Sequence, residues 1–202
     1  AHLASWGITS TTVSLCHSTF DDVDTVQNSR DVIALARAQD SENIVWMGQS
    51  NGGVSALIAG GIAPDLTAGV LGLDPVESFA RGATDWADEV RSPAAALFGI
   101  SDSCNSNNSG RAPFSDVTGS LSLRISEADH CSFEFPTGLL CQIACQRPKT
   151  RFSDAQIGRT ILEFSTAWPL HILDPDFDDS PWWETTGSRY ETLLAEGAIS
   201  PL

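Results

Sequence analysis

A serine flanked by glycines stands at residues 48–52, in the sequence Gly-Gln-Ser-Asn-Gly. The apolar stretch 44–47 before it predicts a short buried strand, and the small apolar residues 52–60 predict a helix packed on a sheet. At such a turn the serine is exposed, and the glycines two residues before and after it avoid a collision between strand and helix. We therefore predict Ser50 as a nucleophile, with the backbone N–H of Asn51 as an oxyanion donor.

A serine hydroxyl is a weak nucleophile at neutral pH, so Ser50 requires a base. The chain has four histidines, and this elbow is followed in the chain first by an acid and then by the catalytic histidine. His2 and His17 precede the elbow, and His171 follows the last major predicted helix. His130, in a loop just beyond a predicted strand, is therefore the predicted base.

Two aspartates between the nucleophile and the base follow predicted strands, and either could orient the imidazole. Asp74 precedes Pro75, which fixes the chain after the carboxylate and suits a rigid, buried residue. Asp102 lies in the Ser/Asn-rich loop 101–110, where aspartate commonly forms turns. We prefer Asp74 as the triad acid and keep Asp102 as the alternative.

The elements around these residues alternate between strand and helix. This alternation predicts one α/β domain, residues 1–202, with a mostly parallel sheet and helices on both faces. Trp182 and Trp183 are interpreted as a staple for the C-terminal tail rather than a lid. The predicted helices are 1–6 (ended by Gly7), 26–39, 52–60 and 156–167 (capped by Ser153-Asp154), and the predicted strands are 8–15, 44–47, 68–73, 94–100 and 121–125.

Composition excludes several partners. The formal charge is −15, from 26 acids and 11 bases of which Lys149 is the only lysine, so no basic stripe for nucleic acid is expected. No apolar run reaches the roughly 18 residues of a membrane span. The five cysteines lack paired C-x-x-C spacing, so we predict no metal site but disulfides and an oxidising compartment.

The cysteine pairing is predicted from proximity to the candidate site. We predict Cys104–Cys131, which would tie down the histidine loop, and a local bridge between Cys141 and Cys145 if that segment is not a regular helix. Bridges from Cys131 to Cys141 or to Cys145 stay open as alternatives. Cys16 is then left as a buried free thiol.

On these residues the chain resembles chlorophyllases and the chlorophyllase-like and lipase-like bacterial α/β hydrolases. The resemblance covers about residues 3–170, and its segments 48–53, 72–76, 104–107 and 130–137 come in the family order. It implies hydrolysis of a carboxylic ester through an acyl-serine, without metal or organic cofactor. Chlorophyllases and pancreatic-type lipases carry the acid in the element matching Asp74, whereas polyester hydrolases carry it at the position of Asp102.

Two features depart from the family. Gln49 stands where relatives carry His or Trp, which we expect to be tolerated because this side chain is outside the triad. Relatives also have strands and a His-Gly oxyanion segment ahead of the first helix, so we expect the chain to belong to a longer, secreted precursor. The leading interpretation is an esterase or lipase-like enzyme for a small or lipid-like ester. The alternatives are a polyester hydrolase or acyltransferase, or a binding protein without activity; the sequence does not predict the oligomeric state.

Overall fold

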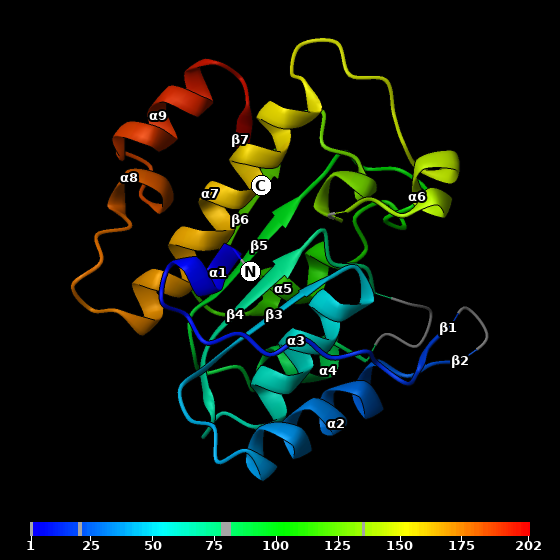
Figure 1. The fold of residues 1–202 in the computed structure, drawn as a ribbon, viewed down its shortest axis with the longest axis vertical. Coiled ribbons are helices and arrows are strands. Elements are labelled where there is room, and N and C mark those ends of the chain that lie inside the picture. The colour runs from blue at the N-terminus through cyan, green and yellow to red at the C-terminus, as the bar shows by residue number, and fades with distance from the viewer. Residues whose placement is uncertain (1, 20–21, 78–81, 135) are drawn as a thin grey trace.

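The computed structural model describes residues 2–19, 22–77, 82–134 and 136–202. In these residues five strands form one sheet, in the order β3-β4-β5-β6-β7 (Figure 1). Strands β3 to β6 run parallel, and β7 pairs antiparallel with β6 at one edge. Their bounds are Ile44–Gln49, Thr67–Leu73, Ala94–Phe98, Leu121–Ile125 and Ile199–Pro201. The predicted mostly parallel sheet is therefore confirmed.

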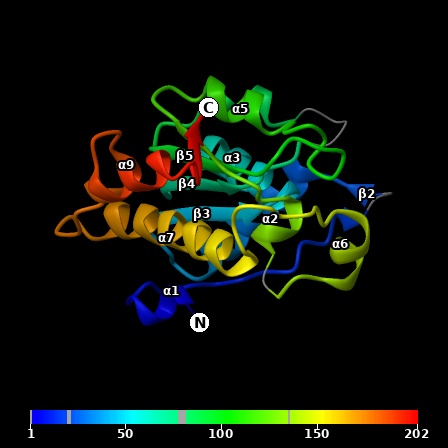
Figure 2. The ribbon, with the colours of Figure 1, turned by 90° about the horizontal axis from the view of Figure 1, so that it is seen from above.

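Helices cover both faces of the sheet, and α3 and α5 lie on the opposite side from α7 (Figure 2). Alternate residues of β5 divide between the two faces, as the period of a strand requires. Ala96 and Phe98 join one buried cluster, with residues of α2 and α3, and Leu97 joins the other, with residues of α7. The helix bounds are Thr25–Ala38 (α2), Asn51–Ile62 (α3), Thr84–Ala87 (α4), Arg111–Asp116 (α5), Leu139–Ala144 (α6), Asp154–Leu173 (α7), Ser180–Trp183 (α8) and Ser188–Ala195 (α9).

The long helix α7 begins at the predicted Ser153-Asp154 cap, two residues before the predicted start at 156. The Ser153 side chain accepts a hydrogen bond from the Gln156 N–H, and the Gln156 side chain accepts one from the Ser153 N–H, which forms a capping box. The helix ends at Leu173, six residues after the predicted end, and continues through Pro169. Trp168 is buried in this extension and its Nε1 donates to the Val70 carbonyl, so packing on the sheet outweighs the cost of the proline.

The N-terminal segment differs from the prediction. Residues 8–15 form no strand and are mostly exposed, and within the described residues they belong to neither sheet. Strand preference largely reflects packing on a half-buried surface, which this segment lacks. The short helix α1, His2–Ser5, precedes Gly7, whose φ of +81° ends it; Ala1 lies outside the described residues. The short strands β1, Ser18–Thr19, and β2, Asp22–Val23, were not predicted.

The C-terminal tail is stapled to the body by Trp183, as predicted. Its ring centroid lies 5.2 Å from that of Phe164 and 5.0 Å from that of Trp168, and its Nε1 donates to the Phe164 carbonyl. Trp182 instead stacks on Phe177. The tail then forms α9 and the edge strand β7, two elements that the sequence analysis did not predict.

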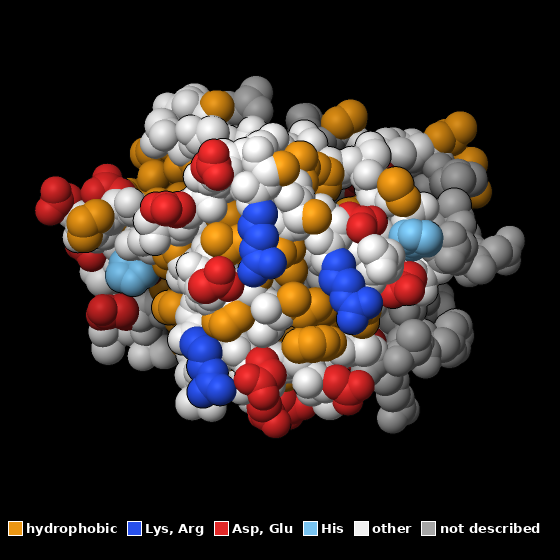
Figure 3. Space-filling view, turned by 90° about the horizontal axis from the view of Figure 1, so that it is seen from below, with side chains coloured by type: hydrophobic (Ala, Val, Ile, Leu, Met, Phe, Trp, Pro, Cys, Tyr) orange, Lys and Arg blue, Asp and Glu red, His pale blue; other side chains and the backbone are white. Residues whose placement is uncertain are grey.

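The surface charge is scattered. On the face drawn in Figure 3, the Lys and Arg side chains stand apart, with acidic side chains around them, so the described part of this face carries no continuous basic stripe. No helix in the described ranges is long and apolar enough to cross a membrane.

Candidate active site

Ser50 lies at the turn between β3 and α3, in a backbone conformation that non-glycine residues rarely adopt. Its φ is +57° and its ψ is −130°. Hydrogen bonds fix this turn from both sides: the Ser50 N–H donates to the Leu73 carbonyl, and the Ser50 carbonyl accepts from the N–H groups of Gly53 and Val76. The serine hydroxyl caps no N–H of α3. The neighbouring chain therefore holds the elbow, and the hydroxyl is left to a side-chain partner.

The glycines of the elbow are not equally crowded. A Cβ on Gly48 would lie 2.2 Å from the backbone carbonyl of Gly52, and a Cβ on Gly53 would lie 2.9 Å from the Gly48 oxygen. A Cβ on Gly52 would meet nothing within 4 Å. The expectation that residues two before and two after the serine both need to lack bulk is thus correct for Gly48 and wrong for Gly52. At residue 52 the helix backbone faces the strand, whereas a side chain there would point away from it.

His130 contacts both the serine and an aspartate. It begins a 3-10 helix, His130–Phe133, beyond the end of β6. Its Nε2 lies 3.1 Å from Ser50 Oγ, and its Nδ1 lies 2.6 Å from Asp74 Oδ2. With the proton on Nδ1, the ring donates to Asp74 and its Nε2 can accept from the serine hydroxyl. Residues 50, 74 and 130, which are far apart in the sequence, are therefore joined by side-chain contacts.

The Asp74 carboxylate is fully buried, and its oxygens have several donors. Oδ1 accepts from the Gly99 N–H at 2.9 Å, and Asn105 Nδ2 lies 3.3 Å from both oxygens. Asp74 has a positive φ of +43°, and its own N–H donates to the Leu97 carbonyl. A buried charge is tolerated only where such partners replace water. These donors replace water around the carboxylate that contacts His130.

Asp102, the alternative acid, has different partners. Its Oδ1 accepts from the N–H groups of Cys104 and Asn105, as expected for a turn-forming aspartate. Its Oδ2 accepts from Arg147 Nε at 3.1 Å. Asp74, and not Asp102, is thus the aspartate in contact with His130.

The turn that carries His130 is held by its neighbour Asp129. The buried Asp129 carboxylate accepts from the Ser132 N–H at the start of the 3-10 helix, from the Arg147 N–H and from Lys149 Nζ. Burial acts to raise the pKa of Asp129, but these hydrogen bonds and the charge of Lys149 hold it below its ordinary value. Lys149 also pairs with Asp154 at 2.8 Å, which links the turn to the start of α7.

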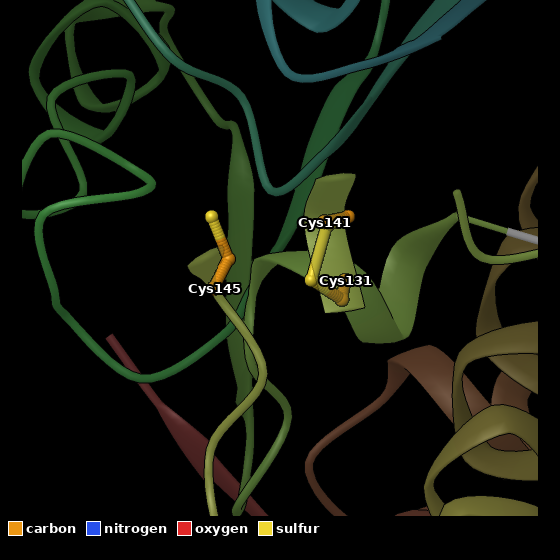
Figure 4. Close-up of side chains that lie close together, drawn as sticks. All are labelled: Cys131, Cys141 and Cys145. Carbon is orange, nitrogen blue, oxygen red and sulfur yellow. A yellow bond between two sulfur atoms is a disulfide. The ribbon is translucent and has the colours of Figure 1, made fainter. Parts of the chain in front are cut away.

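The disulfide pairing differs from our first prediction. The bonds are Cys104–Cys145 and Cys131–Cys141, the second of which was kept as an alternative. Because α6 is a regular helix up to residue 144, Cys141 and Cys145 reach different partners, and Figure 4 shows Cys145 beside the Cys131–Cys141 bond. The Sγ atoms of these three residues lie within 4.8 Å of one another, so the sequence alone could not distinguish the pairings. All three sulfurs are in disulfides, which leaves no thiolate there for a metal ion.

Cys16 was predicted to be buried at a strand end. It is a free cysteine but exposed, because the segment before it is not part of the sheet.

The other histidines lie outside this constellation. His2 contacts the Thr166 hydroxyl, the backbone N–H of His17 donates to Asn28, and His171 pairs with Asp179.

Gln49 contacts the predicted base, which the sequence analysis did not foresee. Its Nε2 lies 3.3 Å from His130 Nε2 and 3.5 Å from the His130 carbonyl oxygen. The only sequence signal was its position directly before the serine, where relatives carry other residues.

A mostly parallel sheet, helices on both faces and a serine at the turn between β3 and α3 define the α/β-hydrolase fold, as the sequence predicted. The first turn of α3 leaves the Asn51 N–H without an earlier helical carbonyl to bond, at the positive end of the helix. The arrangement can thus activate a hydroxyl and can present a donor to a developing oxyanion.

No protein-family model matches the sequence, and no curated protein matches it significantly. Solved structures of other proteins match part of the chain, two hydrolases among them. A predicted CIB-like hydrolase from Thermoplasma acidophilum has 15% identity and a TM-score of 0.47, over 70% of this chain and 59% of its own. A puromycin hydrolase S511A mutant complexed with PGG has 17% identity and a TM-score of 0.46, over 78% of this chain and 26% of its own. The matches thus span less than two thirds of either structure, and likeness at this level assigns no activity to the chain.

Proposed function

We propose that the protein is a serine hydrolase that cleaves a carboxylic ester through an acyl-serine intermediate. The observation that carries the proposal is the unbroken series of contacts from Ser50 Oγ to His130, at 3.1 Å, and from His130 to Asp74, at 2.6 Å. A nucleophile, a base and a group that orients the base are the three parts that this chemistry requires.

In the proposed reaction, His130 Nε2 takes the proton of Ser50 as Oγ attacks the ester carbonyl. Asp74 holds the imidazole through Nδ1 and stabilises the imidazolium, and the Asn51 N–H donates to the oxyanion. The imidazolium then protonates the departing alcohol, which leaves the acyl group on Ser50. Water attacks this ester with His130 again as the base, which releases the acid and restores the serine.

The choice of an ester, small or lipid-like, rests on the resemblance to chlorophyllase-like and lipase-like hydrolases. A polyester hydrolase or acyltransferase would use the same chemistry with another pocket or acceptor. In polyester hydrolases the acid lies at the position of Asp102. Here Asp102 contacts Arg147, which supports Asp74 as the acid instead. The two disulfides support our proposal that the protein works in an oxidising compartment outside the cytoplasm.

The first test replaces the nucleophile and the base. Ser50→Ala and His130→Ala should each abolish turnover of p-nitrophenyl acetate, because the two residues act as one unit. Ser50→Ala should also abolish labelling by a fluorophosphonate probe. Turnover retained in either variant would contradict the assignment, and an unlabelled wild-type protein would favour a binding protein without activity.

The second test compares the two aspartates by the same isosteric change. Asp74→Asn should lower kcat by about 10⁴-fold, because an amide favours the wrong imidazole tautomer. Asp102→Asn should cost less than about tenfold, since its carboxylate contacts Arg147 and a turn rather than the base. The reverse ranking would move the acid to Asp102.

A further inference from the structure

Asn105 lies under the carboxylate of the proposed triad. It belongs to the loop after β5, its side chain is fully buried, and its Nδ2 lies 3.3 Å from each carboxylate oxygen of Asp74. Asp74 Oδ2 is also the atom that contacts His130 Nδ1. Asn105 and His130 therefore share one carboxylate, and Asn105 does not touch the hydroxyl of Ser50.

The orientation of the Asn105 amide is fixed by its other hydrogen bonds. Its Oδ1 accepts from the N–H groups of Asp102 and Asn108, both at 3.0 Å, and its Nδ2 donates to the Ile100 carbonyl at 2.8 Å. A flipped amide would set its oxygen against that carbonyl and against the Asp74 carboxylate, and would leave the part-buried N–H of Asp102 and the buried N–H of Asn108 without their acceptor. The donor end of the side chain thus faces Asp74.

We propose that Asn105 is a positioning residue that holds the Asp74 carboxylate in the orientation from which it contacts His130. The proposal rests on the proposed function, since positioning has a kinetic consequence only if the triad operates. The loop around Asn105 is itself anchored: the neighbouring Cys104 is bonded to Cys145, and Asp102 is paired with Arg147. The loop that carries the side chain is thus tied to residues 145 and 147 by a disulfide and an ion pair.

Without the Asn105 donor, the buried carboxylate keeps the Gly99 N–H and His130 as its partners. The orientation of the carboxylate is then less well defined, and so is that of the His130 ring, whose Nδ1 contacts Oδ2. A base that is less well oriented slows the proton transfer from Ser50 but leaves substrate binding unchanged, so the loss should appear in kcat rather than in KM.

The test uses Asn105→Asp, which keeps an oxygen for the N–H groups of residues 102 and 108 but removes the Nδ2 donor. Asn108→Asp is the matched control, because Asn108 is buried in the same loop and its Nδ2 lies 3.4 Å from the Gly99 carbonyl rather than on Asp74. With p-nitrophenyl acetate, Asn105→Asp should lower kcat at least about 30-fold with KM changed less than about twofold.

If Asn105→Asp does not fold, as judged by near-UV circular dichroism, the pair Asn105→Ala and Asn108→Ala takes its place with the same expected ranking of kcat and the same small change in KM. Equal kcat values within a pair, with turnover that still depends on Ser50, would overturn the role of Asn105 and leave the proposed function intact. Turnover or fluorophosphonate labelling that persists in Ser50→Ala would overturn both.

Discussion

At the elbow, a Cβ added to Gly48 would collide with neighbouring backbone atoms, whereas a Cβ added to Gly52 would meet no atom within 4 Å. An alanine Cβ at 48 would lie 2.2 Å from the carbonyl of Gly52, a distance that backbone atoms can relieve only by moving the strand and helix apart. Residue 52 lies within the first turn of α3, where alanine is a better helix former than glycine. The two glycines of one motif thus have different physical roles.

This difference gives a matched pair of variants. Gly48→Ala should lower the free energy of unfolding by about 3 kcal/mol or more, whereas Gly52→Ala should change it by less than about 1 kcal/mol. Urea unfolding followed by tryptophan fluorescence measures both. Equal destabilisation by the two changes would mean that the strand and helix crowd residue 52 as they do residue 48.

For single residues, a motif and the order of residues along the chain were enough to identify the candidate triad. Ser50 was found because glycines mark the turn, and His130 by its order in the chain; Asp74 was preferred through the proline that follows it. Gln49 and Asn105 were not found, because a contact across 81 or 31 residues leaves no periodic signal. Asn105 even stands within the segment 104–107 that carried the resemblance, yet nothing in that segment indicates what its amide touches.

At the scale of elements, the strands inside the sheet were predicted well, whereas the edge strand and the N-terminal segment were predicted poorly. The bounds of β6 agree with the prediction, and those of β4 differ by one residue, because β4 is a short apolar run and β6 alternates apolar and polar residues between turns. Residues 8–15 carry similar strand-forming side chains but belong to neither sheet of the described residues, and the three-residue strand β7 is too short to show a pattern. Whether a segment pairs as a strand depends on its neighbours in the folded sheet, which its own local sequence does not specify.

The turn between β6 and His130 is joined to the segment before α7 by one carboxylate. Glu127 accepts the N–H groups of Thr150, Arg151 and Phe152, and the Thr150 hydroxyl also donates to it. These hydrogen bonds, that of the Thr150 side chain first, lower the pKa of Glu127 from 4.5 to about 2. A carboxyl whose pKa is lower in the folded than in the unfolded state stabilises the fold at pH values above its ordinary pKa of 4.5. This contribution is lost as the pH falls through the folded-state pKa of about 2.

Glu127→Gln should therefore destabilise the fold most above pH 4.5, and the loss should shrink steadily as the pH falls toward about 2. Urea unfolding of wild type and variant at neutral pH and at about pH 3 gives the comparison. Glu184→Gln, at an exposed glutamate just after α8, serves as the control for the same change of side chain. A Glu127→Gln loss that is the same at both pH values would contradict this role for the carboxylate.

The two disulfides both end in the α6 segment but should differ in effect. Cys104–Cys145 spans 41 residues and Cys131–Cys141 spans 10, so by chain entropy they stabilise by about 4 and about 3 kcal/mol. Cys131, however, directly follows His130. Replacing Cys104 and Cys145 by serine should lower stability more, and replacing Cys131 and Cys141 should lower kcat more at temperatures where both variants are folded. Parallel losses of stability and kcat in the two double variants would show that neither bond acts specifically on the base.

At the scale of the whole molecule, two buried clusters lie on opposite faces of one sheet, and the second depends on the C-terminal tail. Trp183, Tyr190 and Leu193 of the tail belong to that cluster, together with Phe164 and Trp168 of α7. The sequence indicated that the paired tryptophans hold the tail but did not indicate which of them does so. The structure gives them unequal roles, since Trp183 is 6% exposed whereas Trp182 is only partly buried.

Trp183→Ala should accordingly cost about 3–5 kcal/mol of unfolding free energy, because it removes a large buried ring, two aromatic contacts and the hydrogen bond to the Phe164 carbonyl. Trp182→Ala, which loses its stacking on Phe177 at the edge of the cluster, should cost less than half as much. Because the tail reaches the sheet through β7 rather than through Ser50 or Asp74, fluorophosphonate labelling of the folded fraction should stay the same in both variants. A smaller cost for Trp183→Ala than for Trp182→Ala would show that the tail is held elsewhere, and faster labelling in either variant would return the tryptophans to the role of a lid.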